Sequence, residues 1–248
     1  MSSSLVVYGV PFSQPFRAVA WLLLHKQTSF ELALTNPGSS GTGGSRHPDY
    51  LEKFPSGTIP GLEDKESGLL ISESHAIMCY LCSKFGWEDL YPARPEQRAL
   101  IDGYLHFHHR NIREASIGFV APKIRRDLNF SEDVLRISQT NFTRGLKILE
   151  KSFLDRNSYL VGEQITIADF SAYVEIGQLQ SRYTNLYEFS DFPNIKRWLG
   201  DMGDVAYHDD IHVPLQELGD IRDEAPSMES IIDANKKGLI ALRTKLVR

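Results

Sequence analysis

Ser13 is the first residue whose type and position could do chemistry. It follows the apolar run at residues 5–8 and stands directly before a helical pattern, between Pro11 and Pro15. Serine is a preferred helix N-cap residue, and a proline in the first turn costs little. The free amides and dipole of a helix N-terminus also favour an anion such as a thiolate. Ser13 is therefore either a helix cap or a hydroxyl that holds the thiolate of a ligand. A serine-hydrolase role is disfavoured, because the sequence has no G-x-S-x-G pattern.

Two further stretches could bind the rest of such a ligand. Glu73-Ser74 stands between a strand pattern and a helical pattern. The pair either caps the helix or binds a zwitterionic amino-acid head, with Ser74 and nearby amides on the carboxylate and Glu73 on the ammonium group. Thr58-Ile59-Pro60 fits a tight turn that could hold a cis Ile59–Pro60 bond. Such a turn leaves the backbone groups of Ile59 free to pair with an extended peptide.

Two other patterns favour structure over chemistry. Cys79 and Cys82 lie three apart inside a helical run, where cysteines are usually small buried apolar groups, so we do not predict a dithiol site. His106 and His109 share a helix face, but no cysteine or carboxylate stands at a companion spacing typical of a metal site. We expect a partly exposed polar face there and no metal. Arg113, about one turn further on, adds positive charge to this region.

The first 85 residues mix the periods of strands and helices. Strand patterns cover residues 5–8, 29–34, 58–64 and 68–72, and helical patterns cover 15–27 and 72–85. Residues 36–46 are rich in glycine and serine and predict a mobile loop. The order is a βαβ unit followed by a ββα unit, which predicts a small α/β layer.

The rest of the chain predicts helices. Helical patterns cover about residues 96–119, 131–155, 166–183 and 193–202, which favours an all-α bundle. Thr166-x-x-Asp169 has capping-box spacing and predicts a helix start. Residues 204–226 are acidic and contain two prolines, and a last amphipathic helix begins at residue 227, weakened by Gly238. The predicted organisation is an α/β domain at 1–86, a linker at 87–95, an all-α domain at 96–220 and a C-terminal helical extension at 221–248.

Composition narrows the function classes. The 248 residues suffice for one large or two small domains, and 42% hydrophobic and 24% charged residues are typical of globular proteins. The net charge of −5 gives no reason to expect a nucleic-acid partner. The apolar runs fall far short of the roughly 20 residues that span a bilayer, and the first residues make a poor secretion signal. Two cysteines fit a reducing compartment, so we expect a cytoplasmic protein with no membrane partner.

Taken together, these stretches resemble the glutathione S-transferase family. SQPFRAV at 13–19 is similar to the SQPCRAV motif of the theta class, whose serine activates glutathione. GTIPGLED at 57–64 resembles the family's cis-proline segment, and ESHAIMCYL at 73–81 resembles its E-S-x-A-I-x-x-Y-L motif. LYP at 90–92, GEQITIADF at 162–170 and FPNIKRWL at 192–199 resemble later landmarks. The resemblance runs from about residue 5 to about residue 202.

The resemblance implies a thioredoxin-like domain (βαβ-ββα) followed by an all-helical bundle domain, and a glutathione transferase that conjugates glutathione to a hydrophobic electrophile. Ser13 would donate to the glutathione thiolate, supported by Gln14 and Arg17. The implied glutathione-binding residues are Gln14, His47, Thr58, Ile59, Pro60, Glu73, Ser74 and Asp102. Asp102 would reach the neighbouring subunit's site, since the family is usually dimeric. The electrophile pocket would contain Tyr8, Phe12, His109, Arg113 and Phe119.

Three alternatives stay open. Tyr8 ends the first strand pattern, where other classes of the family use a tyrosine, so it ranks second to Ser13 as the activating residue. The same fold also occurs in non-catalytic binding modules, and the last helix could then be a docking element. A glutathione-dependent peroxidase or dehalogenase could use the same site.

Overall fold

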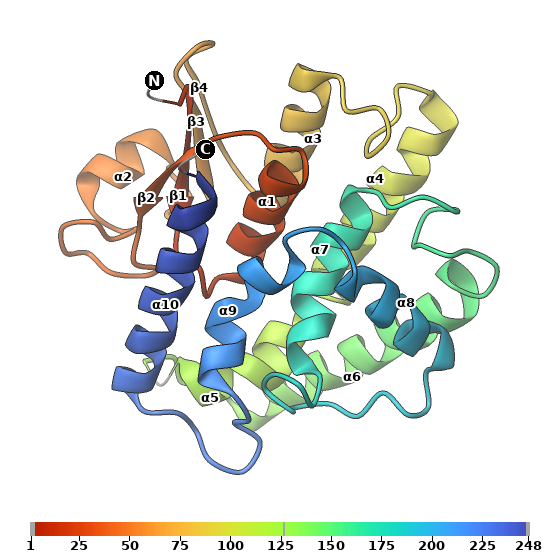
Figure 1. Cartoon of the computed structure of the whole chain (residues 1–248). Helices are drawn as coiled ribbons and strands as arrows, with labels where there is room; N and C mark the ends of the chain where they lie inside the picture. The colour runs from red at the N-terminus through yellow and green to blue at the C-terminus, as the bar shows by residue number, and fades with distance from the viewer. Residues whose placement is uncertain (1–2, 126, 247–248) are drawn as a thin grey trace.

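The N-terminal part of the chain forms a four-stranded mixed sheet with helices on both sides (Figure 1). The structure is a computed structural model that describes residues 3–125 and 127–246. The elements in order are β1 (Leu5–Gly9), α1 (Gln14–His25), β2 (Glu31–Leu34), α2 (Pro48–Lys53), β3 (Gly61–Asp64), β4 (Leu69–Ser72) and α3 (Ser74–Phe85). The strand order is β2-β1-β3-β4, with β1 parallel to β2 and the other two pairs antiparallel. The predicted βαβ-ββα order is confirmed, with α2 as an unpredicted helix.

Helices make up the second part of the chain, as predicted. They are α4 (Pro95–His109), α5 (Ala121–Ile124), α6 (Glu132–Ile148), α7 (Ile167–Ile176), α8 (Pro193–Gly203), α9 (His208–Leu218) and α10 (Met228–Leu246). Short π-helical turns at Ser116–Val120 and Leu149–Phe153 and a 3-10 turn at Gly177–Leu179 extend three of them. No helix in the described ranges is long and apolar enough to cross a membrane.

The core is continuous across the two parts because α1 is buried almost all round. Its residues pack against the sheet, α3, α7 and α9. Trp21 of α1 is fully buried and donates through Nε1 to the carbonyl of Ala206 at 2.9 Å. The helix that begins after Ser13 is therefore fixed by both parts of the molecule.

The capping box at Thr166 and Asp169 is confirmed. Asp169 Oδ2 accepts from the N–H of Thr166 at 2.9 Å, and Thr166 Oγ1 accepts from the N–H of Ala168 at 3.3 Å. The other carboxylate oxygen of Asp169 accepts from the N–H of Leu160 at 2.9 Å and from Nε1 of Trp198 at 3.0 Å. This one side chain starts α7 and ties it to α8.

Two sequence expectations differ from the structure, and a third, the mobility of the loop at 36–46, stays a prediction. Residues 204–226 contain α9, which keeps Pro214 inside the helix, because that helix buries one face that includes Ile211, His212 and Leu215. Strand β3 begins only at Gly61, after Pro60. The loop at 36–46 is held by its own backbone hydrogen bonds, among them Asn36 N–H to Gly43 O at 2.8 Å.

The predicted linker at 87–95 is packed rather than free. Leu90 and Tyr91 are buried in the core, and the carbonyl of Leu90 accepts from the N–H of Ile167 at 3.2 Å. The predicted domain boundaries stay predictions, and their outermost residues, 1–2 and 247–248, lie outside the described ranges. The C-terminal extension contains α10, which packs along α9 (Figure 1).

Candidate active site

Ser13 stands at the N-cap position of α1 in an extended backbone conformation. Its N–H donates to Val10 O at 3.0 Å, and its carbonyl accepts from the N–H of Arg17 at 2.9 Å. Its side chain, however, makes no capping hydrogen bond to the described backbone of the helix. The helix dipole and the unpaired first-turn amides favour an anion here. The half-buried hydroxyl is therefore left for a ligand.

Glu73 precedes α3 in a backbone conformation that is rare for a residue with a side chain. Its φ is 71° and its ψ is 111°. Neither a capping hydrogen bond within the described part of α3 nor burial explains this conformation, because Glu73 is exposed. Strained backbone at a helix mouth is typical of a functional position.

Pro60 follows Ile59 through a cis peptide bond, as the sequence predicted. The ladder between β1 and β3 starts at Gly61, so the peptide groups of Ile59 lie just outside the sheet. The carbonyl of Thr58 accepts from the hydroxyl of Tyr50 at 2.6 Å, which fixes the turn. This arrangement suits pairing with the backbone of an extended peptide.

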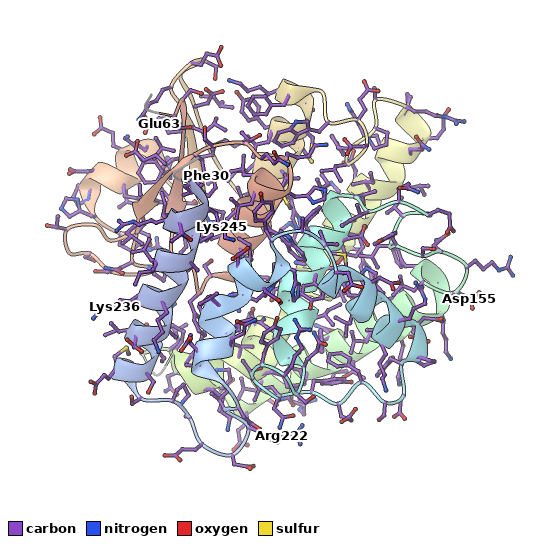
Figure 2. The ribbon with its side chains drawn as sticks, viewed as in Figure 1. Phe30, Glu63, Asp155, Arg222, Lys236 and Lys245 are labelled. Carbon is purple, nitrogen blue, oxygen red and sulfur yellow. The ribbon has the colours of Figure 1, made fainter. Side chains whose placement is uncertain are left out.

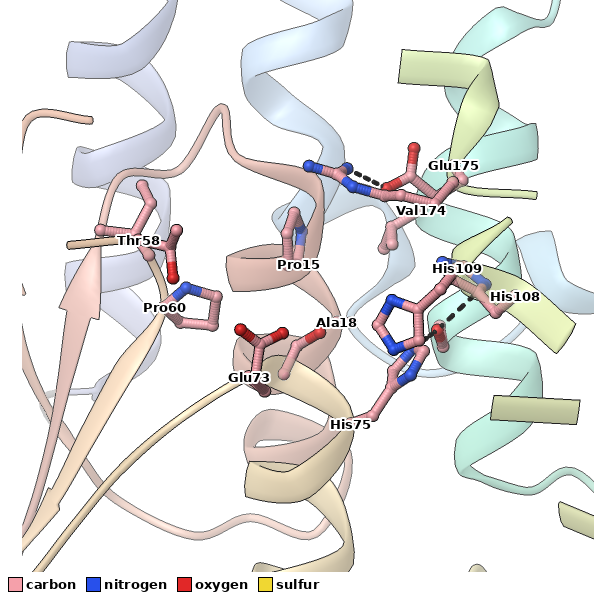
Figure 3. Close-up of a pocket in the computed structure, with 14 residues that line it drawn as sticks. Pro15, Ala18, Thr58, Pro60, Glu73, His75, His108, His109, Val174 and Glu175 are labelled. Carbon is pink, nitrogen blue, oxygen red and sulfur yellow. Dashed lines mark hydrogen bonds and ion pairs between the residues drawn. The ribbon is translucent and has the colours of Figure 1, made fainter. Parts of the chain in front are cut away.

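A pocket of about 160 Å³ joins these stretches to the helical part. Its lining residues are Pro15, Ala18, Thr58, Ile59, Pro60, Glu73, Ser74, His75, His108, His109, Arg113, Ser171, Val174 and Glu175. Figure 3 shows Thr58, Pro60 and Glu73 on one side, the three histidines on the other, and Pro15 and Ala18 of α1 between them. The structure thus brings five predicted glutathione-binding residues and two predicted electrophile-pocket residues to one pocket.

Neutral imidazoles form much of the wall opposite Glu73. His75 Nε2 lies 2.5 Å from Ser171 Oγ, and Ser171 Oγ lies 3.4 Å from His108 Nδ1. Burial lowers the pKa of His75 to about 3, and the nearby charges of His109 and Arg113 act in the same direction. Burial also holds the pKa of His108 well below its usual range. These rings therefore bind through hydrogen bonds and not as cations at neutral pH.

A buried carboxylate anchors the cations near α1. Glu175 is 1% exposed and pairs with Arg113, and it accepts from the hydroxyl of Ser116 at 2.7 Å. Gln14 Nε2 donates to Gln178 at 2.9 Å, and Arg113 reaches Gln14 Oε1 at 3.5 Å. Gln14 is thus placed at the junction with the helical domain, outside the described lining of the pocket.

Tyr8 is engaged elsewhere. Its hydroxyl donates to Glu63 at 2.6 Å and accepts from Lys53 Nζ at 2.8 Å. Burial and the bond to Glu63 raise the pKa of this phenol. Neither Tyr8 nor Ser13 is among the described residues that line the pocket, although Ser13 lies two residues before Pro15 of the lining. The Tyr8 hydroxyl is already bonded to Glu63 and Lys53, whereas the Ser13 hydroxyl makes no capping bond in the described structure, so the geometry favours Ser13 as the residue that meets a thiolate.

The apolar candidates for the second pocket also lie elsewhere. Phe12 packs with Tyr183 and Leu215, and the ring centroid of Phe119 lies 5.5 Å from those of both Phe142 and Tyr187. Neither phenylalanine lines the pocket in the described structure. Tyr8, Phe12 and Phe119 therefore do not line this pocket, because the two phenylalanines pack in the core and Tyr8 is bonded to Glu63 and Lys53. Their place in an electrophile pocket stays a prediction.

His47 and Asp102 both lie outside the lining. His47 is half-exposed at the N-cap of α2, where its Nδ1 accepts from the N–H of Asp49 at 3.4 Å. Asp102 lies on α4, and its Oδ1 accepts from the hydroxyl of Tyr91 at 2.8 Å. The structure does not bring either residue to the described pocket wall.

Sequence reasoning missed several lining residues. Ser171, Val174 and Glu175 stand at i, i+3 and i+4 on α7 and so share one face. The polar residues Ser171 and Glu175 in this largely apolar helix were the available sequence signal for a pocket wall. His75 directly follows Ser74 and points into the same pocket region as His109 (Figure 3). In the described ranges, no group of three or more histidines, cysteines and carboxylates could hold a metal ion.

Comparison with known proteins identifies the family of both parts of the chain. Residues 7–92 match the family model of the glutathione S-transferase N-terminal domain, and residues 108–202 match that of the C-terminal domain. The chain belongs to the glutathione S-transferase family. The predicted family, fold class and enzyme class are therefore confirmed, with glutathione as the co-substrate of the family.

Relatives support the same assignment. The chain is 29% identical over 200 residues to glutathione S-transferase D7 of Anopheles gambiae, covering 78% of this chain and 84% of the relative. It is 27% identical over 245 residues to glutathione S-transferase T3 of Arabidopsis thaliana, covering 94% of this chain and 40% of the relative. It also matches the solved structure of an epsilon-class glutathione S-transferase from the housefly, Musca domestica, with a TM-score of 0.69 and 28% identity over 97% of this chain and 98% of that one.

Proposed function

We propose that this transferase binds glutathione with its sulfur at Ser13, stabilises the thiolate and adds it to a small hydrophobic electrophile. The observation that carries the proposal is the Ser13 hydroxyl, which stands at the N-terminus of α1 without a capping bond in the described structure. One hydroxyl donor and a helix terminus both favour the ionised thiol. Each unit of thiol acidification corresponds to about 1.4 kcal/mol of preferential thiolate binding.

The remaining parts of glutathione have matching partners. Glu73 and Ser74 would bind the γ-glutamyl head, and the backbone of Ile59 would pair with the cysteinyl part, beside Thr58 and Pro60. All of these residues line the same pocket. His47 would approach the glycyl carboxylate from the start of α2, a role supported by its half-exposed position.

The electrophile would lie against α1 and the helical domain. Pro15, Ala18 and Val174 supply apolar surface, while His109 and Arg113 supply polar groups. The sulfur would form a bond to an electrophilic carbon, and the electron pair would leave with a leaving group or be protonated in an addition.

The class, assembly and compartment are finer proposals. The SQPFRAV motif supports a theta-like, serine-type class. Exposed Leu70 on β4 and Leu100 on α4, 42% and 63% accessible, support a homodimer in which Asp102 faces the neighbouring subunit. Cys79 and Cys82 are both free thiols, which supports a cytoplasmic location. Sedimentation of the wild type and of Leu100→Glu tests the dimer.

A titration of bound glutathione tests the activation step. Thiolate absorbance is followed against pH in the wild type, Ser13→Ala and the matched control Tyr8→Phe. We expect a thiol pKa well below that of free glutathione in the wild type and in Tyr8→Phe. In Ser13→Ala the pKa should return toward the free value and turnover should fall, with little change in glutathione affinity. Unchanged turnover in Ser13→Ala would refute the assignment.

A further inference from the structure

The backbone of Phe12, the residue before Ser13, is held by two side chains, one at its N–H and one at its carbonyl. The N–H of Phe12 donates to Oδ1 of Asn235 at 3.0 Å, across 223 positions of the chain. The carbonyl of Phe12 accepts from Nη1 of Arg17 at 2.7 Å. Phe12 lies in the connection between β1 and α1, where no ladder or helix supplies these bonds. The position of Phe12 therefore depends on two specific side chains, one of them in the C-terminal extension.

Arg17, which binds the carbonyl of Phe12, is itself held rigidly. Its side chain is 1% exposed, and its other guanidinium nitrogen reaches Val174 O at 3.3 Å and Gln178 Oε1 at 3.4 Å. These partners belong to α7 and the turn after it. The helical domain thus fixes the carbonyl side of Phe12.

Asn235, which binds the N–H of Phe12, lies on α10. Its Nδ2 donates to Ile231 O of its own helix at 3.4 Å, which turns Oδ1 toward Phe12. Gly238, nearly one turn further along α10, has no side chain, so the helix can approach Pro11 and Pro214 closely. A Cβ at this position would lie 3.0 Å from Cβ of Pro11 and 2.9 Å from Cδ of Pro214. The glycine that weakens the helix in sequence terms therefore permits contact with the loop that carries Ser13.

Ion pairs and apolar packing hold α10 in this place. Lys237 Nζ pairs with Glu217 of α9 at 2.7 Å, and Lys245 Nζ pairs with Asp210 at 3.2 Å. Leu242 on the same helix is 2% exposed. Lys236 is exposed and points to the side away from α9 (Figure 2). The helix packs on its own chain, which disfavours its use as a free docking element.

We propose that Asn235 is a positioning residue for Ser13, so that α10 fixes the direction of the activating hydroxyl. This inference rests on the proposed function of Ser13. The N–H of Ser13 bonds to Val10 and its carbonyl to Arg17, so its side chain follows the loop that Asn235 and Arg17 hold. A hydroxyl donates well only within a narrow range of distance and angle, so a small shift of this loop weakens the bond to a thiolate.

The test compares Asn235→Ala and Gly238→Ala with Lys236→Ala, a control on the same helix. The bound-glutathione thiol pKa, kcat and KM are measured for each full-length variant, with the thermal unfolding midpoint as a check on folding. We expect Asn235→Ala and Gly238→Ala each to move the pKa of the bound thiol toward that of free glutathione and to lower kcat about tenfold, with KM for glutathione little changed. Lys236→Ala should behave as the wild type.

The outcomes separate the two proposals. A bound thiol that is acidified in the wild type and equally acidified in Asn235→Ala overturns the positioning role alone. A wild type that binds glutathione without acidifying it overturns the role of Ser13 and this inference with it. If Asn235→Ala does not fold, Gly238→Ala decides, because it keeps the acceptor and only pushes the helix from Pro11 and Pro214.

Discussion

His75 Nε2 of α3 and Ser171 Oγ of α7 lie 2.5 Å apart and connect the two domains at the pocket. The connection continues from Ser171 to His108 and from His108 to the hydroxyl of Tyr104, at 3.4 Å and 3.2 Å. The ring centroids of His75 and His108 are 4.8 Å apart. Two imidazolium ions at that distance in a buried site would repel each other strongly, so the connection depends on neutral rings.

The first prediction is that stability falls as the pH drops below about 6.5. An unfolded histidine has a pKa of about 6.5, whereas the pKa of His75 in the folded protein is about 3. Between these values the unfolded state binds one more proton, so acid favours unfolding. His108 and His212, whose pKa values also lie well below the usual range, act with the same sign. Each such histidine should contribute about 1.4 kcal/mol per pH unit to the loss.

Urea unfolding of the wild type and His75→Gln from pH 7 to pH 4 measures this effect. The slope of the unfolding free energy against pH gives the number of protons taken up on unfolding. This number should be about one lower in the variant than in the wild type, whatever the stability of the variant at pH 7. Equal slopes in the two proteins would show that His75 is not held neutral by the fold.

The second prediction concerns Asp169. Replacing it by alanine should lower the free energy of unfolding by about 3–5 kcal/mol, because the N–H groups of Leu160 and Thr166 and Nε1 of Trp198 lose their acceptor in the core. Asp169→Asn, which keeps one acceptor oxygen, should lose less. Thermal or urea unfolding of both variants provides the measurement. A loss in the alanine variant as small as in a surface substitution would contradict the bonding described here.

Local sequence signals mark the residues on one side of the candidate site. Ser13 and the Glu73-Ser74 pair stand at helix starts, and Pro60 stands at a turn, so neighbours in sequence determine their geometry. The opposite wall depends on how the domains dock. His75 and Ser171, for instance, meet across 96 positions, and no local pattern encodes that meeting.

The differences between the sequence expectations and the structure have physical causes of the same kind. Phe12 and Phe119 are apolar, and an apolar side chain does not specify which part of the core it joins. Pro214 predicted an interruption, yet α9 continues through it, with the ring packed closely against Gly238 of α10. Packing between α9 and α10 therefore outweighs the weak helix preference of Pro214 and of Gly238.

The third prediction concerns the buried pair of Glu175 and Arg113. Glu175→Gln should lower the free energy of unfolding by about 2–4 kcal/mol, because Arg113 and the buried Arg17 would lose their nearby carboxylate. Arg113→Gln should also destabilise, since it leaves the carboxylate without its cation. The double variant should be more stable than the sum of the single losses implies, by about 1–3 kcal/mol. A double-mutant cycle by urea unfolding measures this coupling, and additive losses would refute it.

The fourth prediction separates strain from binding at Glu73. Both Glu73→Gly and Glu73→Ala remove the carboxylate, so glutathione affinity should fall about tenfold or more in each, with kcat less affected. Only glycine also relieves the φ of 71°. The glycine variant should therefore be about 1 kcal/mol more stable than the alanine variant. Calorimetric titration with glutathione and thermal unfolding test the two effects independently. Equal stabilities would show that the conformation is not strained, and unchanged affinity would remove Glu73 from the glutathione site.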